Sequence, residues 1–503
     1  MKASKMQWSD CVQYVEKTCS APHQKRIFDH WKDLRAFGLF WEQGVGKTKP
    51  AIDKFAYLYQ LGKVQALFVV APNNVHRNWV DDELPKHLPE ALLQKCAIYY
   101  YRSSKAKLKR EIAARKAFLH HQGPVILCMS YNGMRTKLGK AFARKFMLTF
   151  QTFGVADESQ CFKSPGAKIT PTVVASGRYM PWKAILSGTP VTHGPFDVYA
   201  QLKFLDEEFW TRLNLEPFAV FKKHFGVFRL RSEILEEEGW DPGYDQLVGY
   251  KNEEELAGYL KLIAHRLTKD TAGLKLPPKV YTKRYFDLTP RQMQCYVELE
   301  EDLVTQIPES GDLLEVLDTL TLGTRLAQIV CGYVATEAGE PVQRIDDKNP
   351  RLACLRETIE TMEGKNIIWS RFTPDIDLIM EMLTEMGRKP VRYDGQVSDD
   401  ERAVNKKLFQ EGDATDFVVH YQSGYSGLTL HAAKNVHYYC NTYNWGHRAQ
   451  SEDRAHRMGL QHSVLYIDYI ANNTMDLKVV KNLLKKHKFA QKLLGDAPTD
   501  WIG

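Results

Sequence analysis

Short apolar runs alternate with longer stretches of helical spacing in two separate regions of the chain. The alternation covers about residues 36–190 and returns at about residues 365–470. Apolar runs of strand length separated by amphipathic stretches are typical of parallel strands joined by helices. The pattern therefore predicts the fold class α/β, with two parallel-sheet lobes and helical insertions between and upon them.

The region between the two lobes carries few strand signals. Amphipathic spacing at 293–303 and 313–330 indicates helices, whereas tandem prolines exclude a helix interior at 275–281 and indicate a connector. The polar residues 341–350 are a second candidate linker. The predicted segments are a first lobe at 1–204, a helical region with the connector at 205–350, a second lobe at 351–495 and a tail at 496–503.

The composition fits a large protein with an ample core. The chain has 503 residues, 44% of them hydrophobic, which is enough for about three domains. No signal-like segment opens the chain and no run of about 18 apolar residues occurs, so we expect an intracellular protein. The compactness of the chain favours the cytoplasm of a bacterium or of a virus-infected host cell. The nine cysteines show no ligand spacing, which predicts reduced thiols and neither disulfides nor zinc.

The first candidate site is WEQGVGKT at 41–48, which follows an apolar run at 37–40. Glycines let backbone N–H groups face phosphate oxygens, the lysine reaches the β- and γ-phosphates, and the threonine hydroxyl ligates Mg²⁺. The alternative is an ordinary glycine-rich turn, because such a string arises by chance in about one chain in fifty of this size. The residues predicted to bind ATP here are Gly44, Val45, Gly46, Lys47 and Thr48.

The second candidate site is VADESQ at 155–160, which follows an apolar approach at 146–153 expected to end as a buried strand. Two adjacent acids at the carboxyl end of a strand point in different directions. Asp157 is therefore predicted to hold Mg²⁺ together with Thr48, and Glu158 to polarise the attacking water. The alternative is a solvated acidic pair that opens a loop.

The third candidate site is QSEDRAHRMG at 450–459, after an apolar strand predicted at 436–440. On a helix, Gln450, Arg454 and Arg457 would share one face. Two guanidinium groups that close over a nucleotide would stabilise charge in the transition state, and an arginine finger is typically worth about 10³ to 10⁵ in rate. The alternative is a solvated helix side. His456 lies off this face and is expected to pack or cap.

These motifs belong to a longer series that resembles helicase superfamily two, and within it the SWI/SNF-like group of double-stranded DNA translocases. The match is collinear from about residue 20 to about residue 495. The other segments are APHQ at 21–24, FVVAPNNVHRNW at 68–79, ILCMSYNGMR at 126–135, ILSGTPVTHGPFDVYAQLKFL at 185–205, IIWSRFT at 367–373, YDGQVSDDER at 393–402 and SGYSGLTLHAAKNV at 423–436. The stretches that distinguish the group are HRLTKD at 265–270, LPPK at 276–279 and DLTPRQ at 287–292.

The resemblance implies two RecA-like lobes with helical protrusions between them, with ATP and Mg²⁺ as cofactors. It implies that Gln24 reads the adenine ring and that Gln450 contacts ATP. Residues FKKHFG, GWDPG and NEEEL within 221–256 resemble the annealing-helicase, or HARP-like, branch. The chain departs from the family at Gln160, where a histidine is usual, and at Trp41, which replaces a small or acidic residue.

Two further groups of residues are candidates for coupling the nucleotide state to movement. The first group lies between the acidic strand and the helical region, and the second could offer backbone amides to a phosphate. The candidates are Ser187, Gly188, Thr189, Gly424, Ser426 and Gly427.

The formal net charge is +7, and the positive charge is concentrated in three runs at 102–116, 135–145 and 478–492. A single run of this kind is by default a solvated helix face. Together, on an ATPase, the three runs are expected to follow a nucleic-acid backbone, with binding that weakens as salt rises. The predicted partner is therefore DNA, bound without sequence specificity by a protein that is most simply a monomer.

The predicted function is an ATP hydrolase that moves on duplex or branched DNA, in fork remodelling, branch migration, annealing or repair. Half of the active site would lie on each lobe, so that hydrolysis occurs when the lobes close around ATP. Three alternatives remain open: a strand-separating helicase on DNA or RNA, a remover of DNA-bound proteins, and a scaffold with a degenerate nucleotide site.

Overall fold

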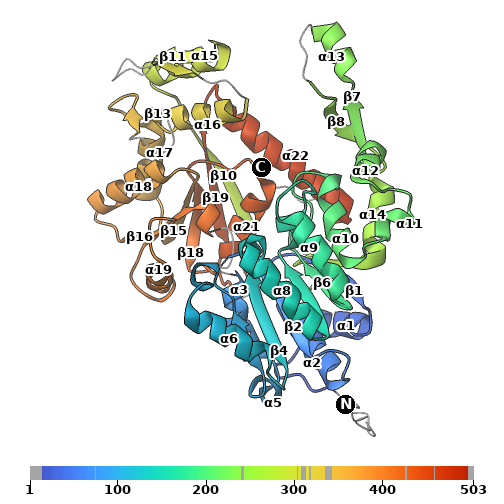
Figure 1. Ribbon diagram of the computed structural model, residues 1–503. Helices are drawn as coiled ribbons and strands as arrows, with labels where there is room; N and C mark the ends of the chain where they lie inside the picture. The colour runs from blue at the N-terminus through green and yellow to red at the C-terminus, as the bar shows by residue number, and fades with distance from the viewer. Residues whose placement is uncertain are drawn as a thin grey trace. The chain divides into compact units, whose positions relative to one another are not determined.

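The computed structural model describes residues 14–73, 75–238, 243–302, 304–306, 313–315, 319–334, 342–424, 428–457 and 459–496. The chain divides into two compact units between Ala272 and Gly273. Figure 1 colours the first unit from blue to green and the second from yellow to red. Each unit is built around a parallel sheet of its own.

The first unit contains a seven-stranded sheet in the order β3-β4-β2-β5-β6-β1-β9, and all neighbouring strands are parallel. The strands are β1 (Ala36–Trp41), β2 (Ala66–Ala71), β3 (Ala97–Tyr100), β4 (Val125–Ser130), β5 (Thr152–Asp157), β6 (Trp182–Leu186) and β9 (Ala264–Leu267). Strands β2, β4 and β5 are buried along their whole length. Both faces of the sheet are therefore covered, as is usual for parallel sheets.

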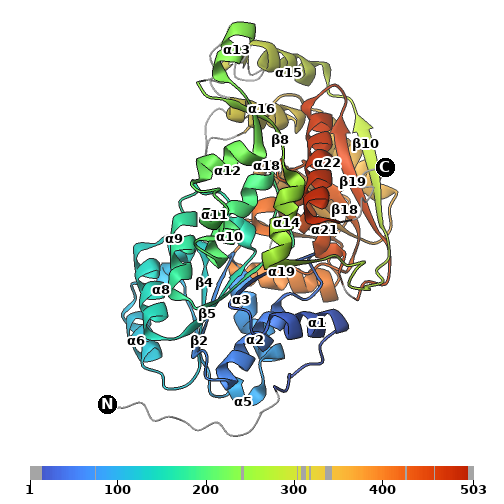
Figure 2. The ribbon, with the colours of Figure 1, turned by 90° about the vertical axis from the view of Figure 1, so that its right-hand side faces the viewer.

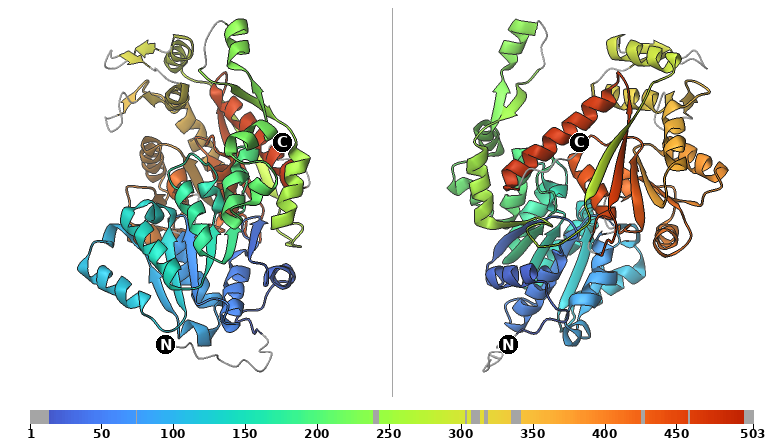
Figure 3. Two further views of the ribbon diagram at one scale, coloured as in Figure 1. Left: turned by 45° about the vertical axis from the view of Figure 1, so that its right-hand side comes forward. Right: turned by 180° about the vertical axis from the view of Figure 1, so that it is seen from behind.

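Helices connect these strands and extend the unit beyond the sheet. They are α1 (Pro22–Trp31), α2 (Thr48–Gln60), α3 (Val75–Asn78), α4 (Leu84–His87), α5 (Glu90–Leu93), α6 (Lys109–Leu119), α7 (Tyr131–Arg135), α8 (Lys137–Thr149), α9 (Thr170–Ser176), α10 (Tyr199–Leu205), α11 (Phe209–Arg212), α12 (Phe218–Phe225), α13 (Arg231–Glu238) and α14 (Glu253–Ile263). An antiparallel hairpin of β7 (Gly226–Arg229) and β8 (Gln246–Tyr250) carries α13. Figure 3 shows this hairpin extending away from the parallel sheet of its unit.

The second unit contains a six-stranded parallel sheet in the order β10-β19-β18-β15-β17-β16. The strands are β10 (Lys279–Phe286), β15 (Lys365–Ser370), β16 (Pro390–Tyr393), β17 (Asp416–His420), β18 (Ala433–Tyr438) and β19 (Val464–Ala471). Successive side chains of a strand point to opposite faces. Accordingly Ile368 belongs to one apolar cluster and Ile367 and Trp369 belong to another, so the unit has a core on each side of its sheet.

The helices of the second unit are α15 (Pro290–Asp302), α16 (Thr319–Val330), α17 (Pro350–Glu360), α18 (Thr373–Glu385), α19 (Asp399–Glu411), α20 (Tyr421–Gly424), α21 (Trp445–Ala455) and α22 (Met475–Leu494). Two small antiparallel pairs join β11 (Val304–Gln306) to β12 (Leu313–Glu315) and β13 (Tyr333–Val334) to β14 (Gln343–Arg344). Figure 2 shows the long helix α22 beside β19. None of the described helices combines the length and the apolar character needed to cross a lipid bilayer.

The two parallel sheets confirm the predicted fold class, but the region at 205–350 is less helical than expected. It supplies β9 to the first sheet and β10 to the second, where the predicted connector at 275–281 already enters β10 at Lys279. Neither strand gives an apolar run that the sequence pattern could reveal. Strand β9 is only four residues long, and β10 is an edge strand whose residues are partly exposed. The segment boundaries proposed from the sequence stay predictions.

Two other local expectations need correction. The apolar approach at 146–153 is not one strand, because its first residues complete α8 and β5 begins only at Thr152. The candidate linker at 341–350 contains β14 and ends where Pro350 begins α17, while Pro341 lies outside the described residues.

Candidate nucleotide site

The glycine-rich loop connects strand β1, which lies between β6 and β9, to the amino terminus of α2. Thr48 is the first residue of α2 and Lys47 is its N-cap. Gly44 has φ 81° and Gly46 has φ 82°, in the left-handed region that favours glycine. A Cβ atom on Gly46 would also lie 2.5 Å from Gln24 Nε2. The loop thus needs these glycines, and it places backbone N–H groups at a helix amino terminus, where anions bind.

Helix α1 holds the loop from one side. Gln24 Nε2 donates to Gly46 O at 2.9 Å, while Gln24 Oε1 accepts from the N–H of Ala21 at 2.9 Å. The His23 ring bonds to Val45 O at 3.0 Å. The structure therefore places Gln24 directly on the loop, and its contact with adenine stays a prediction.

Lys47 and Trp41 are buried at the base of the loop. Lys47 Nζ donates to Trp41 O at 3.0 Å and to Glu42 O at 3.4 Å. The Trp41 ring is fully buried, and its Nε1 donates to His265 Nδ1 at 2.9 Å. Trp41 is thus a packing residue that supports the turn from beneath.

The acidic pair lies at the carboxyl end of β5. Asp157 Oδ2 accepts from Trp79 Nε1 at 2.9 Å, and Asp157 Oδ1 accepts from the N–H of Glu158 at 2.9 Å. Glu158 itself has φ 50°, a left-handed conformation that costs a non-glycine residue about 1 to 3 kcal/mol. The prediction that the two carboxylates point in different directions stays a prediction. Trp79 was not predicted to contact Asp157, because 78 positions separate the two residues.

The loop and the acidic pair lie close together. Burial and the neighbouring charge of Glu158 raise the pKa of Asp157 to about 7, whereas Trp79 and the positive charge of Lys47 act to lower it. Gln43 Nε2, from the loop, donates to Glu158 Oε1 at 3.4 Å. Two motifs that are far apart in the sequence thus form one site.

The predicted coupling residues at 187–189 are linked to this site by hydrogen bonds. Gln160 Nε2 donates to Glu158 Oε2 at 2.8 Å, and Ser187 Oγ donates to Gln160 Oε1 at 2.6 Å. The N–H of Thr189 then donates to Ser187 Oγ at 3.1 Å. Gly188 has no room for a side chain, since a Cβ atom would lie 2.6 Å from Gln43 Cγ. Gln160, which replaces the usual histidine, is therefore the middle member of a continuous chain of contacts.

The stretch at 265–270 supports the loop from the other side. Its strand β9 pairs with β1, and Arg266 Nη1 donates to Phe40 O at 2.8 Å. The N–H of Lys269 donates to Glu42 Oε2 at 2.8 Å. Sequence reasoning recognised this stretch as typical of a family but did not predict that it holds the phosphate loop.

In the second unit, Gln450 and Arg454 are buried on α21, whose N-cap Asn444 accepts from the N–H of Gly446 at 2.8 Å. The helix ends at Ala455, so the prediction that Arg457 shares its face is wrong. The helix ends because His456 takes a non-helical conformation, and its ring bonds to Pro277 O at 2.8 Å. The expectation that His456 packs or caps is confirmed.

Arg454 and Arg457 nevertheless converge on one segment. Arg454 Nη1 donates to Leu428 O at 3.1 Å, and Arg457 Nη1 donates to Thr429 Oγ1 at 2.6 Å. This segment directly follows the second group of coupling candidates. Gly424 in that group is closely packed, because a Cβ atom would lie 2.2 Å from Val419 Cγ2. Ser426 and Gly427 lie outside the described residues.

A buried network of charges holds α21 in place. Arg448 binds Asp468 through two nitrogen atoms, at 2.5 and 3.0 Å, and its Nε lies 2.9 Å from Glu452 Oε1. Lys279, from the LPPK stretch, lies 3.1 Å from Glu452 Oε2 and 3.5 Å from Asp453 Oδ1. Burial alone would lower the pKa of Lys279, yet the nearby Tyr281, Asp453 and Glu452 raise it well above its ordinary value. The connector thus anchors the helix that carries Arg454.

A glycine-rich loop at a helix amino terminus, beside a buried carboxylate at the end of a parallel strand, defines a nucleotide-binding protein of the α/β class. Residues 32–333 match the model of the SNF2-related domain, and residues 350–459 match the helicase conserved C-terminal domain. The chain therefore belongs to the SNF2-related family, as its motifs predicted.

Several known proteins are similar over most of the chain. An uncharacterized ATP-dependent helicase of Mycoplasma genitalium is 24% identical over 461 residues, which are 90% of this chain and 40% of the relative. The human DNA annealing helicase and endonuclease ZRANB3 is 26% identical over 444 residues, 86% of this chain and 36% of the relative. The SWI/SNF-related regulator of chromatin subfamily A-like protein 1 of Drosophila melanogaster is 26% identical over 450 residues, 88% of this chain and 51% of the relative. The chain thus spans about half or less of the length of these relatives.

Among solved structures, the Sulfolobus solfataricus SWI2/SNF2 ATPase core in complex with dsDNA is 22% identical. The match covers 96% of this chain and 94% of that chain, with a TM-score of 0.39.

Proposed function

We propose that the chain is an ATP-dependent translocase that hydrolyses ATP to move along duplex or branched DNA, in fork remodelling, branch migration, annealing or repair. The observation that carries the proposal is the chain of contacts from Gln43 through Glu158 and Gln160 to Ser187. It connects the phosphate loop and the proposed catalytic base to a segment that can report the state of the nucleotide. A simple nucleotide-binding site has no need of such a connection.

The side chains around the loop fit ATP with Mg²⁺. Gly44, Val45 and Gly46 would offer backbone N–H groups to the phosphates, and Lys47 would neutralise their charge. Thr48 and Asp157 would hold the ion, which when bound neutralises developing charge on the phosphates. The placement of both residues supports this assignment, because Thr48 begins α2 directly after the loop and Asp157 ends β5, whose acidic pair contacts the loop through Gln43. Glu158 would orient and deprotonate the attacking water.

Gln450, Arg454 and Arg457 would complete the site from the second unit when the two units close around ATP. The observations that support this role lie within the second unit. The two arginines converge on residues 428–429, and contacts of Arg448 and Lys279 anchor α21. In this scheme a closed state hydrolyses ATP and an open state releases the products. If each unit also binds DNA, alternation between the two states would move one DNA-binding surface relative to the other.

Helix α22 is the best-defined candidate for a DNA-binding surface. Five exposed lysines recur along it at helical spacing and so share one face: Lys478, Lys481, Lys485, Lys488 and Lys492. The helix has 20 residues and is therefore about 30 Å long. Exposed basic residues also recur on α8, at Lys137, Lys140 and Arg144. Contacts of this kind bind phosphates and carry no base information.

The lysine face can be tested by reversing its charge. The triple substitution Lys481→Glu, Lys485→Glu and Lys488→Glu should weaken duplex binding uniformly across sequences. It should also flatten the dependence of log K on log salt by about 0.9 for each phosphate that the protein no longer neutralises. The matched control changes the same residues to arginine and should bind as the unchanged protein does. Equal affinity and equal salt dependence in all three proteins would contradict the assignment of this face.

The proposed activity itself is tested by ATP hydrolysis with duplex DNA, forked DNA, single-stranded DNA and RNA as stimulants. We expect the duplex and forked molecules to stimulate most. Preference for RNA would favour the strand-separating alternative, and equal basal rates with all four would contradict a motor. Displacement of a DNA-bound protein without movement on bare DNA would favour the protein-removing alternative.

A further inference from the structure

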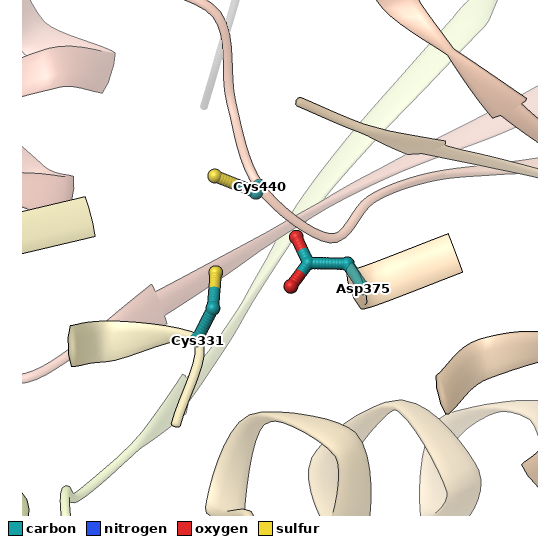
Figure 4. Close-up of side chains that lie close together, drawn as sticks. All are labelled: Cys331, Asp375 and Cys440. Atoms are coloured by element: carbon teal, nitrogen blue, oxygen red, sulfur yellow. The ribbon is translucent and has the colours of Figure 1, made fainter. Parts of the chain in front are cut away.

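Three side chains that are far apart in the sequence converge in the second unit. Cys331 directly follows α16, Asp375 lies in the first turn of α18, and Cys440 follows β18. Figure 4 shows the three side chains reaching toward one another from these separate segments. One sulfur or oxygen atom of each lies within 4.8 Å of the others, and all three residues are buried. Two thiols and a carboxyl group in one apolar core form a set of potential metal ligands.

The carboxyl group of Asp375 uses only one of its oxygen atoms in a regular hydrogen bond. Ser370 Oγ donates to Asp375 Oδ2, whereas Oδ1 accepts no hydrogen bond of regular geometry from the described residues. The nearby Tyr333 hydroxyl is also buried and lies close enough to interact with the Asp375 carboxyl group, but it forms no hydrogen bond of regular geometry within the described part of the chain. Burial raises the pKa of Asp375 to about 6, although Ser370, Arg351, Tyr333 and Cys331 act in the opposite direction. A buried polar oxygen is costly unless a proton or a cation meets it.

A positive charge lies beside the same three groups. Arg351 is fully buried, and its guanidinium donates to Tyr439 O and to Asp476. Burial raises the pKa of the Cys331 thiol well above its usual range, and the charge of Arg351 acts against that rise. A divalent ion held by two thiolates and one carboxylate carries one net negative charge. Arg351 is therefore placed to offset the charge of such a complex.

We propose that Cys331, Asp375 and Cys440 form a zinc-binding site in the second unit. Thiolates select zinc over magnesium, and two sulfur ligands with one oxygen ligand suit its tetrahedral coordination. The Tyr333 hydroxyl or a water molecule would take the fourth position. Zinc–sulfur bonds of about 2.3 Å place two sulfur ligands about 3.8 Å apart. The observed separations of 4.8 Å or less therefore need only small side-chain movements to close around an ion.

Binding would release the thiol protons to solvent and would tie together α16, α18 and the end of β18. Residue 440 begins the loop that leads to Asn444, the N-cap of α21. A bound ion would thus stabilise the base of the helix that carries Arg454. This role is structural and does not depend on the proposed translocase function. Sequence reasoning could not find the site, because its members show no local ligand spacing.

The test measures zinc and cobalt binding by the whole chain. Protein purified under reducing conditions without a chelator should contain one zinc ion per chain by elemental mass spectrometry. Replacement of zinc by Co²⁺ should give a thiolate-to-cobalt absorption band and the visible bands of a tetrahedral site. Cys440→Ser and Asp375→Asn should each lose the ion. Cys354→Ser, a half-buried cysteine of α17 outside the cluster, should retain it.

A second measurement keeps the proposal falsifiable if the variants fail to fold. In the unchanged protein, kept in a urea concentration that lets the buried thiols react slowly, added zinc should slow the alkylation of Cys331 and Cys440 in a peptide map by more than it slows that of Cys354. Absence of the cobalt band together with unprotected labelling would overturn the proposal. A disulfide between Cys331 and Cys440 in protein that binds no metal would overturn it too, and would identify a redox pair.

Discussion

The proposed catalytic side chains lie on the phosphate loop and at the end of β5 in the first unit, and on α21 and just beyond it in the second. The two regions hold their buried charges differently. At the loop, Lys47 donates to main-chain carbonyl groups, and burial beside Glu158 raises the pKa of Asp157 to about 7. Along α21, carboxylates surround Arg448 and Lys279 and raise the pKa of each well above its ordinary value.

The difference indicates that the two regions have different roles. A strained turn at Glu158 and a perturbed carboxyl group are common where a ligand binds, because the ligand supplies charge that the protein lacks. A buried network in which each cation already has its carboxylates gains nothing from a further ion. Its role is to fix the geometry of a neighbouring residue, here Arg454.

The largest expected effect comes from removing the loop cation. Lys47→Ala should lower ATP turnover by at least about 10²-fold, because a preorganised charge on the phosphates is removed. Its effect on the free energy of unfolding should be modest, since each hydrogen bond from Lys47 to a main-chain carbonyl group contributes about 1 kcal/mol. Steady-state hydrolysis and urea unfolding measure the two quantities. The exposed residue Lys86, changed to alanine, is the control and should alter neither.

The substitution Glu158→Gln tests the assignment of Glu158 as the catalytic base. It should abolish turnover while ATP binding persists, because the amide keeps the shape of the side chain but cannot accept a proton. Fluorescent-nucleotide binding and hydrolysis on the same preparation separate the two effects. Turnover at the level of the unchanged protein would show that Glu158 is not the base.

Breaking the α21 network should instead affect stability first. Arg448→Met leaves Asp468 buried without its cation and leaves Glu452 with Lys279 alone, and removal of one partner from a buried ion pair costs about 3 to 5 kcal/mol. Chemical denaturation measures the change. The control is Arg356→Met, which removes a surface pair with Glu385 and should cost less than about 1 kcal/mol. Equal destabilisation in both variants would contradict the contrast between the two regions.

An effect that appears only as pH changes is expected from Lys54, a buried cation of α2 that donates to the carbonyl oxygens of Trp31 and Leu34. Burial lowers its pKa from 10.5 to about 7. Between these values the unfolded chain binds the proton more tightly than the folded chain, so stability should rise as pH increases from 7 toward 10. Lys54→Met should remove this rise, and Lys86→Met should preserve it. Identical pH profiles from urea unfolding of all three proteins would contradict the prediction.

The parts of the fold that could be predicted are those determined by a local pattern of consecutive residues. The loop at 41–48 begins at the end of a largely buried strand, and Asp157 ends another, so both motifs could be placed on a parallel sheet. Strand β10 could not be recognised, because an edge strand buries too little to leave an apolar run.

The remaining errors have a common physical cause, which is contact between distant residues. The helix before Arg457 stops where His456 bonds to Pro277 O, 179 positions away. Trp79, which follows β2 in the chain, reaches Asp157 at the end of the neighbouring strand β5. The three groups of the proposed zinc site come from the end of α16, the first turn of α18 and the segment after β18. No local pattern encodes such contacts, so only the folded chain reveals them.

The central claim is that ATP held by the first unit is hydrolysed only when arginines of the second unit contribute. The most direct test compares Arg457→Ala with the unchanged protein, measuring duplex-stimulated turnover and affinity for a non-hydrolysable ATP analogue in parallel. We predict that turnover falls by about 10³-fold or more, as for the removal of an arginine finger, while affinity falls much less. Turnover that stays at the level of the unchanged protein, or a fall in affinity that accounts for the whole effect, would contradict the claim.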